Sequence, residues 1–381
     1  MMIYHDFKGM RLSSIGMGCM RFPTTGDYDG FVDEAQVRQM VDYAISHGVN
    51  YFDTAWGYHS GRSESIISSC LREYPRDAYH LATKFPGYNV DNFDRKEEIF
   101  EEQLRKTKVG CFDFYLLHNV VELNIEQYLD TSSRGIVPYL LEQRERGRIG
   151  HLGFSCHGEL ETLVRLMETW GDEMEFCQIQ LNYQDWFFQH ADWKVDWLVE
   201  HDVPIIAMEP LRGGHLAEFS AEEQAKLDAL RAGVSPVEWG YRYVQSTPGV
   251  MVTLSGMSNL EQCEQNIAIF ETDHPLSAEE RVALEDVARA RVAKNAVPCT
   301  ACRYCIDHCP SELNIPYLIS LYNEYLSKDD ENWLSVLKLE ALPDEELPAM
   351  CLACGNCTRV CPQHIDVAAV LDDFIDRLSR G

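Results

Sequence analysis

The feature that most limits the fold is a strand-like run followed by a helix-like stretch, repeated eight times along most of the chain. Each run is short and apolar, with little alternation of polar and apolar residues, as is usual where both faces of a parallel strand are buried. The eight runs, each followed by an amphipathic stretch, cover residues 12–18, 50–55, 79–84, 112–118, 150–155, 177–182, 204–210 and 250–256.

Eight such units match the size of a closed (β/α)₈ barrel, which typically takes about 250 residues. An open doubly wound sheet is less favoured, because no Gly-x-Gly-x-x-Gly sequence follows the first run. Single cores stop growing at roughly 250–300 residues, so a chain of 381 residues predicts a second domain. We expect a TIM-type barrel over residues 1–292 and a small, mainly α-helical domain over residues 293–381.

The charge and the N-terminal sequence exclude several classes of partner. With 33 basic and 61 acidic residues, the net charge of −28 repels nucleic acid and anionic membrane surfaces. The first residues lack the cationic start and apolar stretch of a signal peptide, and no apolar run approaches ~18 residues. We therefore expect a cytoplasmic protein with neither a nucleic-acid nor a membrane partner.

Eight of the 14 cysteines fall in two runs, 299–309 and 351–361, that each read Cys-x₂-Cys-x₂-Cys-x₃-Cys-Pro. Three thiolates this close in sequence can hold one face of a [4Fe–4S] cluster, while the fourth binds the other cluster. The runs predict two clusters with a cross-over between them. One cluster is assigned to Cys299, Cys302, Cys305 and Cys361, and the other to Cys351, Cys354, Cys357 and Cys309.

Zinc and disulfides are the alternatives for these cysteines. Zinc sites commonly pair two Cys-x₂-Cys knuckles into one Cys₄ site, without the fourth cysteine and proline seen in each run. Disulfides are disfavoured by the tight spacing and by the reducing compartment expected for this chain. The helical stretch between the runs resembles the α-helical ferredoxin modules of multi-domain oxidoreductases.

Four polar residues follow or close the second, third and fourth predicted strands: Asp53, Tyr58, Lys84 and His118. Active sites of TIM barrels lie at this end of the strands, although any one of these residues could simply cap a loop. The Lys84 ammonium would favour ionisation of Tyr58 and so ease proton donation. Asp53 would hold Lys84 by an ion pair, and His118 would orient a carbonyl oxygen.

At this point residues 3–290 resemble the aldo-keto reductase family. The tetrad is in register, and GRSE, RIGHLGFS, QLNY and SGMSNLEQCEQN also match. The resemblance implies interconversion of a carbonyl and an alcohol, with NADP or NAD bound in extended form on the barrel rim. The cofactor contacts that it implies are Gly18, Cys19, Met20, Ser155, Gln180, Met208, Ser255, Gly256, Met257, Asn259 and Asn266.

Three positions depart from the family pattern. Met208 replaces the tyrosine that usually stacks on the nicotinamide, although a thioether can also pack on a ring. Cys156 replaces a common asparagine, and Gln262 replaces an arginine that often binds the 2′-phosphate. A neutral amide cannot make that charged contact, so the preference between NADP and NAD stays open.

Three hypotheses for the whole chain follow. The first is an enzyme that reduces a carbonyl or oxidises an alcohol, and whose clusters are either structural or pass electrons to a redox partner protein. The second is an electron-transfer subunit whose barrel is a docking scaffold, and the third gives the clusters a purely structural role. Because nicotinamide transfers a hydride and a cubane one electron, direct coupling normally needs a flavin or a radical-tolerant substrate, and no flavin motif is present. The substrate is open; aromatic residues that could line its pocket are Trp56, Trp186, Phe187 and Phe188.

Overall fold

The computed structural model describes residues 1–26, 31–295, 297, 299, 305–326, 333–361 and 363–380, with only the backbone described at 292–295 and 307. The chain divides into two compact units, Met1–Glu285 and Asp286–Gly381. This division falls in helix α13 (Ala278–Asn295), the helix that also contains the predicted boundary at residue 292. In the described part of the chain, none of the helices has the length and hydrophobicity needed to span a membrane.

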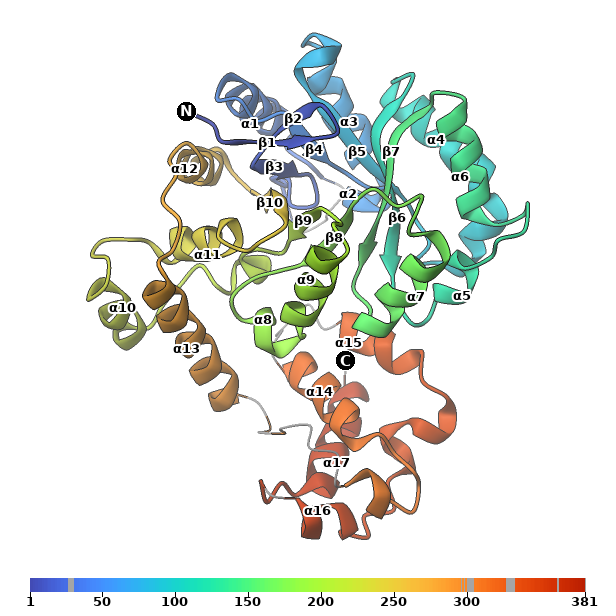
Figure 1. Cartoon of the computed structure of the whole chain (residues 1–381), viewed down its shortest axis with the longest axis vertical. Coiled ribbons are helices and arrows are strands. Elements are labelled where there is room, and N and C mark those ends of the chain that lie inside the picture. The colour runs from blue at the N-terminus through green and yellow to red at the C-terminus, as the bar shows by residue number, and fades with distance from the viewer. Residues whose placement is uncertain are drawn as a thin grey trace. The chain divides into compact units, whose positions relative to one another are not determined.

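The first unit is a closed barrel of eight parallel strands, as the sequence predicts (Figure 1). Each strand pairs with the next along the chain, and the last returns to the first. The strands are β3 (Ile15–Gly18), β4 (Tyr51–Asp53), β5 (His80–Phe85), β6 (Phe112–Val120), β7 (Ile149–Cys156), β8 (Cys177–Gln180), β9 (Ile205–Met208) and β10 (Val250–Gly256).

One helix packs outside the barrel after each strand, because its apolar face must be buried against the sheet. These eight helices are α1 (Glu34–Ser46), α3 (Ser63–Leu71), α4 (Lys96–Thr107), α6 (Ile136–Glu145), α7 (Leu160–Trp170), α9 (Ala191–Glu200), α11 (Pro236–Gln245) and α12 (Leu260–Phe270). Shorter helices in the loops are α2 (Tyr58–Gly61), α5 (Ile125–Tyr128), α8 (Asp185–Phe188) and α10 (Ala221–Asp228).

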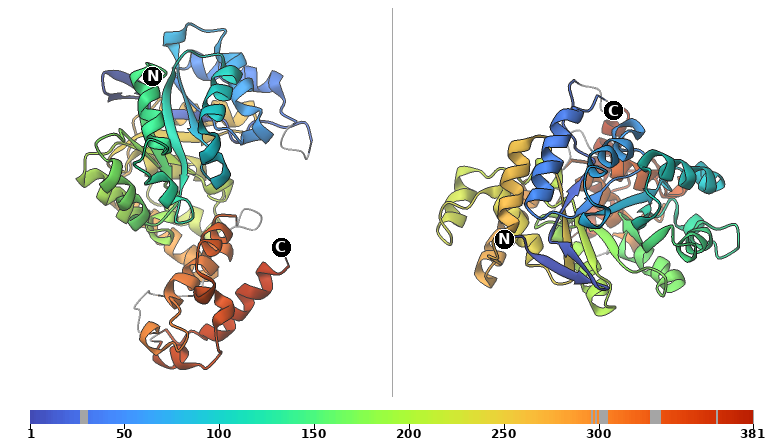
Figure 2. Two further views of the ribbon diagram at one scale, coloured as in Figure 1. Left: turned by 90° about the vertical axis from the view of Figure 1, so that its right-hand side faces the viewer. Right: turned by 90° about the horizontal axis from the view of Figure 1, so that it is seen from above.

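An N-terminal hairpin, β1 (Tyr4–Phe7) and β2 (Met10–Ser13), closes one end of the barrel. Its Phe7 ring lies 5.6 Å from the ring of Phe114 and 6.2 Å from that of Phe176, inside the barrel core. The hairpin crosses the barrel end in the right-hand view of Figure 2. The predicted first strand, 12–18, therefore belongs to two elements, and the hairpin seals the end opposite the loops that follow the strands.

Tight packing fills the interior of the barrel. A Cβ on Gly16 of β3 would lie 2.9 Å from side-chain atoms of Leu254 and Tyr51, so only glycine fits at this position. The barrel is thus a packed core and not a pore, and a ligand must bind at the rim.

The C-terminal unit repeats one local structure after the last cysteine of each run. Glu312 and His364, three residues after Cys309 and Cys361, both have a left-handed φ of 54°. Their backbone N–H groups donate to the carbonyl oxygens of these cysteines at 3.0 and 3.1 Å. The turns lead into the helices α14 and α17. The helices of this unit are α14 (Ile315–Leu326), α15 (Trp333–Glu340), α16 (Asn356–Val360) and α17 (Val367–Leu378).

Candidate active site and iron–sulfur site

A buried ion pair joins the ends of two neighbouring strands. The Nζ of Lys84 on β5 lies 2.6 Å from Oδ1 of Asp53 on β4 and donates to the carbonyl oxygen of Thr54 at 2.8 Å. The Lys84 side chain is fully buried. Taking two charges out of water is costly unless they are paired, so each of these residues depends on the other.

Tyr58 stands on α2, a single strained turn after β4. The next two residues, His59 and Ser60, have left-handed φ values of 52° and 53°, which are unfavourable for side chains other than glycine. The His59 ring stacks on Phe22 at 5.3 Å and accepts a hydrogen bond from the Phe22 backbone N–H. These contacts hold the strained turn and fix the position of Tyr58.

The environment of Tyr58 adds the effect of burial to the effect of Lys84 that the sequence predicts. Lys84 Nζ lies 5.1 Å from the centre of the Tyr58 ring, and its charge does lower the pKa of the phenol. Burial acts in the opposite direction and outweighs that charge, so the pKa of Tyr58 is raised above its ordinary value. The phenol stays protonated at neutral pH and is suited to donate a proton.

His118 completes the predicted tetrad. Its ring meets that of Tyr58 edge-on at 5.9 Å between centres. Burial, and then the nearby charge of Lys84, hold the pKa of His118 well below its usual range, so the ring is neutral. Within the described residues, its Nδ1 has no hydrogen-bond partner. The structure therefore brings all four predicted residues together at the rim, with one ring nitrogen unused.

Besides His118 Nδ1 and Asp53 Oδ2, two buried amide oxygens at this rim lack a partner among the described residues. They are Oδ1 of Asn119, which follows His118, and Oε1 of Gln178 on β8. The Gln178 amide nitrogen donates to the sulfur of Met208 at 3.3 Å. Buried acceptors are normally satisfied, so these two oxygens are free to accept hydrogen bonds from an amide group such as that of a nicotinamide.

Gln178 is a candidate that the sequence analysis missed. It pairs directly with Ser155 across β7 and β8, whereas the predicted Gln180 lies one register step beyond and donates to Asp185 at 2.7 Å. Strand register could have revealed this difference, because residues 178 and 180 point to the same face and only one of them adjoins Ser155. The Ser155 hydroxyl accepts from the Asn119 N–H at 2.8 Å.

The predicted ribose contacts follow β3. The backbone N–H of Cys19 donates to the carbonyl oxygen of Asp53 at 2.8 Å, and its thiol is buried in the core, which raises its pKa. Gly18 pairs with Gly256 in the neighbouring strand β10, and the Met20 side chain is exposed. Of these three residues, only Met20 can offer its side chain to a ligand at the rim, and Gly18 can offer its backbone.

The predicted pyrophosphate and adenosine contacts follow β10. The Ser255 hydroxyl hydrogen-bonds with the hydroxyl of Tyr241 at 2.7 Å and with the amide of Asn266 at 3.1 Å, all three buried. The Asn259 side chain accepts from the Gln262 N–H at 2.8 Å and caps α12. Gly256, which is exposed, and Met257, which is buried, lie in the chain between Ser255 and Asn259.

An ion pair crosses this part of the rim. Arg21, after β3, reaches Glu209, after β9, with 3.6 Å between Nη2 and Oε1. A Cβ on Gly256 would lie 3.1 Å from the Arg21 side chain, so the arginine passes over the end of β10. A cation and an anion therefore both face the region predicted to hold the pyrophosphate.

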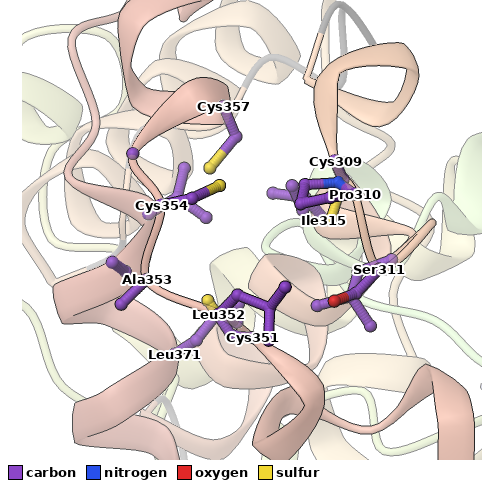
Figure 3. A pocket seen from close by; sticks show the side chains of 14 residues that line it. Cys309, Pro310, Ser311, Ile315, Cys351, Leu352, Ala353, Cys354, Cys357 and Leu371 are labelled. Carbon is purple, nitrogen blue, oxygen red and sulfur yellow. The ribbon is translucent and has the colours of Figure 1, made fainter.

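In the C-terminal unit, four cysteines line a pocket (Figure 3). They are Cys351, Cys354 and Cys357 from the second run and Cys309 from the first, the set predicted for one cluster. The figure shows the sulfurs of Cys354 and Cys357 directed into the space. Apolar side chains such as Leu313, Ile315 and Leu371 form the rest of the wall. Four thiols around a pocket with a largely apolar wall fit a cubane cluster.

The remaining candidate ligands are only partly described. Cys302 lies outside the described residues, whereas Cys299, Cys305 and Cys361 pack against the core of the unit. Asn323 of α14 positions Cys299 by two hydrogen bonds, of 2.7 and 2.9 Å, to the backbone of Val297. No described cysteine forms a disulfide. No group of three described His, Cys, Asp or Glu side chains is close enough to hold a single metal ion.

Two family models match the chain. The model described as the aldo/keto reductase family covers residues 14–289. The chain belongs to the aldo-keto reductase family. A second model, described as a 4Fe-4S dicluster domain, covers residues 298–365, so this oxidoreductase carries a ferredoxin-type domain after the barrel.

The relatives and solved structures agree with this assignment. An uncharacterized oxidoreductase, YqkF, of Bacillus subtilis (strain 168) is 24% identical over 290 residues, covering 67% of this chain and 86% of the relative. L-galactose dehydrogenase of Arabidopsis thaliana is 23% identical over an alignment that covers 75% of this chain and 93% of the relative. Among solved structures, aldo-keto reductase AKR11C1 from Bacillus halodurans (holo form) superposes with a TM-score of 0.62 at 21% identity, and the match covers 76% of this chain and 97% of that structure. An aldo-keto reductase from Klebsiella pneumoniae in complex with NADP and acetate superposes with a TM-score of 0.58 at 21% identity, and the match covers 74% of this chain and 93% of that structure.

Proposed function

We propose that this aldo-keto reductase interconverts a carbonyl and an alcohol with a nicotinamide cofactor, and that its C-terminal domain binds two [4Fe–4S] clusters. The observation that carries the first part is the buried tetrad Asp53, Tyr58, Lys84 and His118, with its unused ring nitrogen and its protonated phenol. A scaffold protein needs none of these four groups in this arrangement.

Two buried oxygens, unpaired within the described part of the chain, support a cofactor site beside the tetrad. The cofactor's carboxamide would donate to Gln178 Oε1 and Asn119 Oδ1, two of the buried oxygens that lack a partner among the described residues. When bound in reduced form, nicotinamide supplies a hydride to the carbonyl carbon. Tyr58 then donates its proton to the carbonyl oxygen, so that an alcohol and oxidised cofactor result. Neutral His118 orients this oxygen by a hydrogen bond, and Asp53 fixes Lys84 behind Tyr58.

Substitution of Tyr58 by Phe tests this function. Because it removes only the proton donor, it should lower aldehyde reduction with NADPH or NADH by about 10²–10⁴-fold. The melting temperature should stay nearly unchanged, since the hydroxyl is not part of the core. Unchanged turnover in the variant would contradict the proposed mechanism.

The cluster assignment can be tested by iron content. The proposed cross-over makes Cys309 and Cys351 ligands of the same cluster although they lie in different runs. Anaerobically purified Cys309→Ser and Cys351→Ser variants should each lose half of the bound iron, and the double variant should lose no more than either. The matched control is Cys111→Ser in the barrel, which should retain all of the iron.

One observation favours electron transfer by the clusters over a purely structural role. The cysteine-lined pocket reaches the surface, where Cys354 is exposed and Leu352 is 67% exposed. A purely structural cluster gains nothing from such an opening, whereas electron transfer to a partner needs a short path. Anaerobic titration with NADPH, followed by absorbance near the cluster band, tests the link to the barrel: bleaching would exclude the structural role. If NADPH does not bleach the clusters, but chemically reduced clusters are rapidly oxidised by an added acceptor, electron transfer independent of the barrel's reductase activity would be favoured.

A further inference from the structure

A second buried ion pair lies between helices α3 and α4, behind the strand that carries Lys84. Glu64, the last residue of the GRSE segment, lies in the first turn of α3 and is fully buried. Its Oε2 lies 3.2 Å from Nζ of Lys106 on α4, and only 14% of that lysine's side chain is exposed. Taking two charges out of water gains little stability, so this pair calls for another explanation.

The other oxygen of Glu64 faces the strand that carries Lys84. Oε1 accepts hydrogen bonds from the Thr83 hydroxyl at 2.7 Å and from the amide nitrogen of Gln103 at 2.8 Å. The same amide nitrogen donates to the backbone carbonyl oxygen of Lys84 at 3.0 Å. The Tyr115 hydroxyl donates to Oε1 of Gln103 at 2.6 Å, which fixes the orientation of the amide. Glu64 therefore holds the main chain at Lys84 through Gln103.

Lys106 connects Glu64 to the loop that carries Tyr58. Its Nζ lies 3.9 Å from the centre of the Trp56 ring, a distance at which a cation is attracted to the face of the ring. In the chain, Trp56 precedes Tyr58 and Glu64 follows it. Lys106 thus closes the loop between Trp56 and Glu64, and the strained turn with Tyr58 lies inside this loop.

This network reaches both members of the proposed proton-donating pair. Lys84 is held by its ion pair with Asp53 and, through its main chain, by Gln103. Lys84 and Tyr58 lie on different elements, so the 5.1 Å between the Lys84 Nζ and the centre of the Tyr58 ring depends on such cross-connections. Displacements of about 1 Å caused far from the reacting atoms can slow a reaction by about 100-fold.

We propose that Glu64 is a positioning residue that holds Tyr58 against Lys84 through Gln103 and Lys106. The inference rests on the proposed reductase function. Among the described residues, no hydrogen bond or ion pair joins Glu64 to the tetrad itself, so it acts through these two partners. A network that served stability alone would change unfolding, but not the chemical step in the folded protein.

The test measures oxidation of NADPH by propanal in single turnover, with the full-length protein. Lys106→Met combined with Glu64→Gln removes both charges and leaves no buried charge unpaired, so the melting temperature should stay close to that of wild type. Because the loop is no longer closed, the single-turnover rate should fall by about 10–100-fold, while the Kd for NADPH should change by less than about twofold.

Three further variants complete the test. Lys106→Arg keeps a cation beside Glu64 and over the Trp56 ring, and should retain most of the rate. Gln103→Leu breaks only the connection to the main chain of Lys84, and should also slow the reaction if the double variant does not fold. The matched control, Arg231→Met with Glu280→Gln, removes an ion pair of 2.7 Å between the loop after α10 and helix α13, and should change neither rate nor Kd.

The possible failures are distinguishable. A wild-type rate in the double variant, an equal loss in the control pair, or a Lys106→Arg variant as slow as the double variant would each overturn the positioning role of Glu64. If wild-type protein neither reduces propanal with NADPH nor oxidises 1-propanol with NADP, the proposed reductase function is overturned, and this inference with it.

Discussion

The two ends of the barrel each carry a cluster of charged residues, but the clusters differ in how completely their hydrogen bonds are satisfied. At the end closed by the hairpin, Glu175 contacts Lys8 and His151, both at 2.7 Å, and Arg144 at 3.6 Å. At the other rim, Asp53 and His118 each keep a buried atom without a partner in the described part of the chain. The Tyr51 hydroxyl near the hairpin also lacks a partner among the described residues. The binding site is therefore indicated by the grouping of the tetrad with such atoms at the rim, and not by unpaired atoms alone.

The largest effect is expected from Lys84→Met. It leaves Asp53 as a buried charge without its cation, which should lower the free energy of unfolding by about 3–5 kcal/mol and abolish reduction. The double variant Asp53→Leu with Lys84→Met should recover most of the stability in urea denaturation but none of the activity. Recovery of activity would contradict the catalytic role of this pair.

Glu175→Gln should affect stability alone. Removal of the charge weakens the bonds from His151 and Lys8 and should cost about 1–2 kcal/mol at pH 7, with kcat unchanged. These partners hold the pKa of Glu175 at about 2, below the ordinary 4.5, so the stabilisation is present above pH 4.5 and is lost as the pH falls toward 2. The difference in urea midpoint between variant and wild type should shrink over that range, and a constant difference would contradict the assignment.

Glu209→Gln should have a smaller effect, on cofactor binding. The carboxylate lies beside the region proposed for the pyrophosphate and holds Arg21 at 3.6 Å. Neutralising Glu209 removes the repulsion between its carboxylate and the cofactor's pyrophosphate, and it frees Arg21 to contact that pyrophosphate. The Kd for NADPH should therefore fall by about three- to tenfold. Arg21→Gln should raise the Kd instead. Changes in the same direction in both variants, measured by fluorescence titration, would show that charge is not the cause.

The smallest effect is expected from pH. His118 has its pKa well below 6.5 and Tyr58 has its pKa above 10, so both keep the protonation state needed for carbonyl reduction across neutral pH. The value of kcat/KM should therefore be flat between about pH 6.5 and 9. An acidic limb near pH 6.5 would mean that His118 titrates in the free enzyme and is more solvated than the structure indicates.

The barrel and the tetrad could be predicted from the sequence because both are encoded in short stretches of neighbouring residues. Apolar runs of parallel strands and the polar residues at their ends repeat along the chain, and a closed barrel brings those ends together. The hairpin was missed because its strands are short and only Phe7 and Leu12 enter the core. Gln178 was missed because neighbouring glutamines on one strand face differ only in their register with Ser155.

The sequence by itself determined the eight units of the barrel, the four residues of the tetrad and the two cysteine runs, because residue type and spacing carry that information. Only the tertiary structure decided the balance of effects at Tyr58, where burial raises the pKa more than the charge of Lys84 lowers it. It also decided that Tyr88 stands against His118, whereas the grouping of Cys309 with the second cysteine run around one pocket agrees with the cross-over that the spacing predicts. These facts depend on distances between residues far apart in the chain, and packing alone sets such distances.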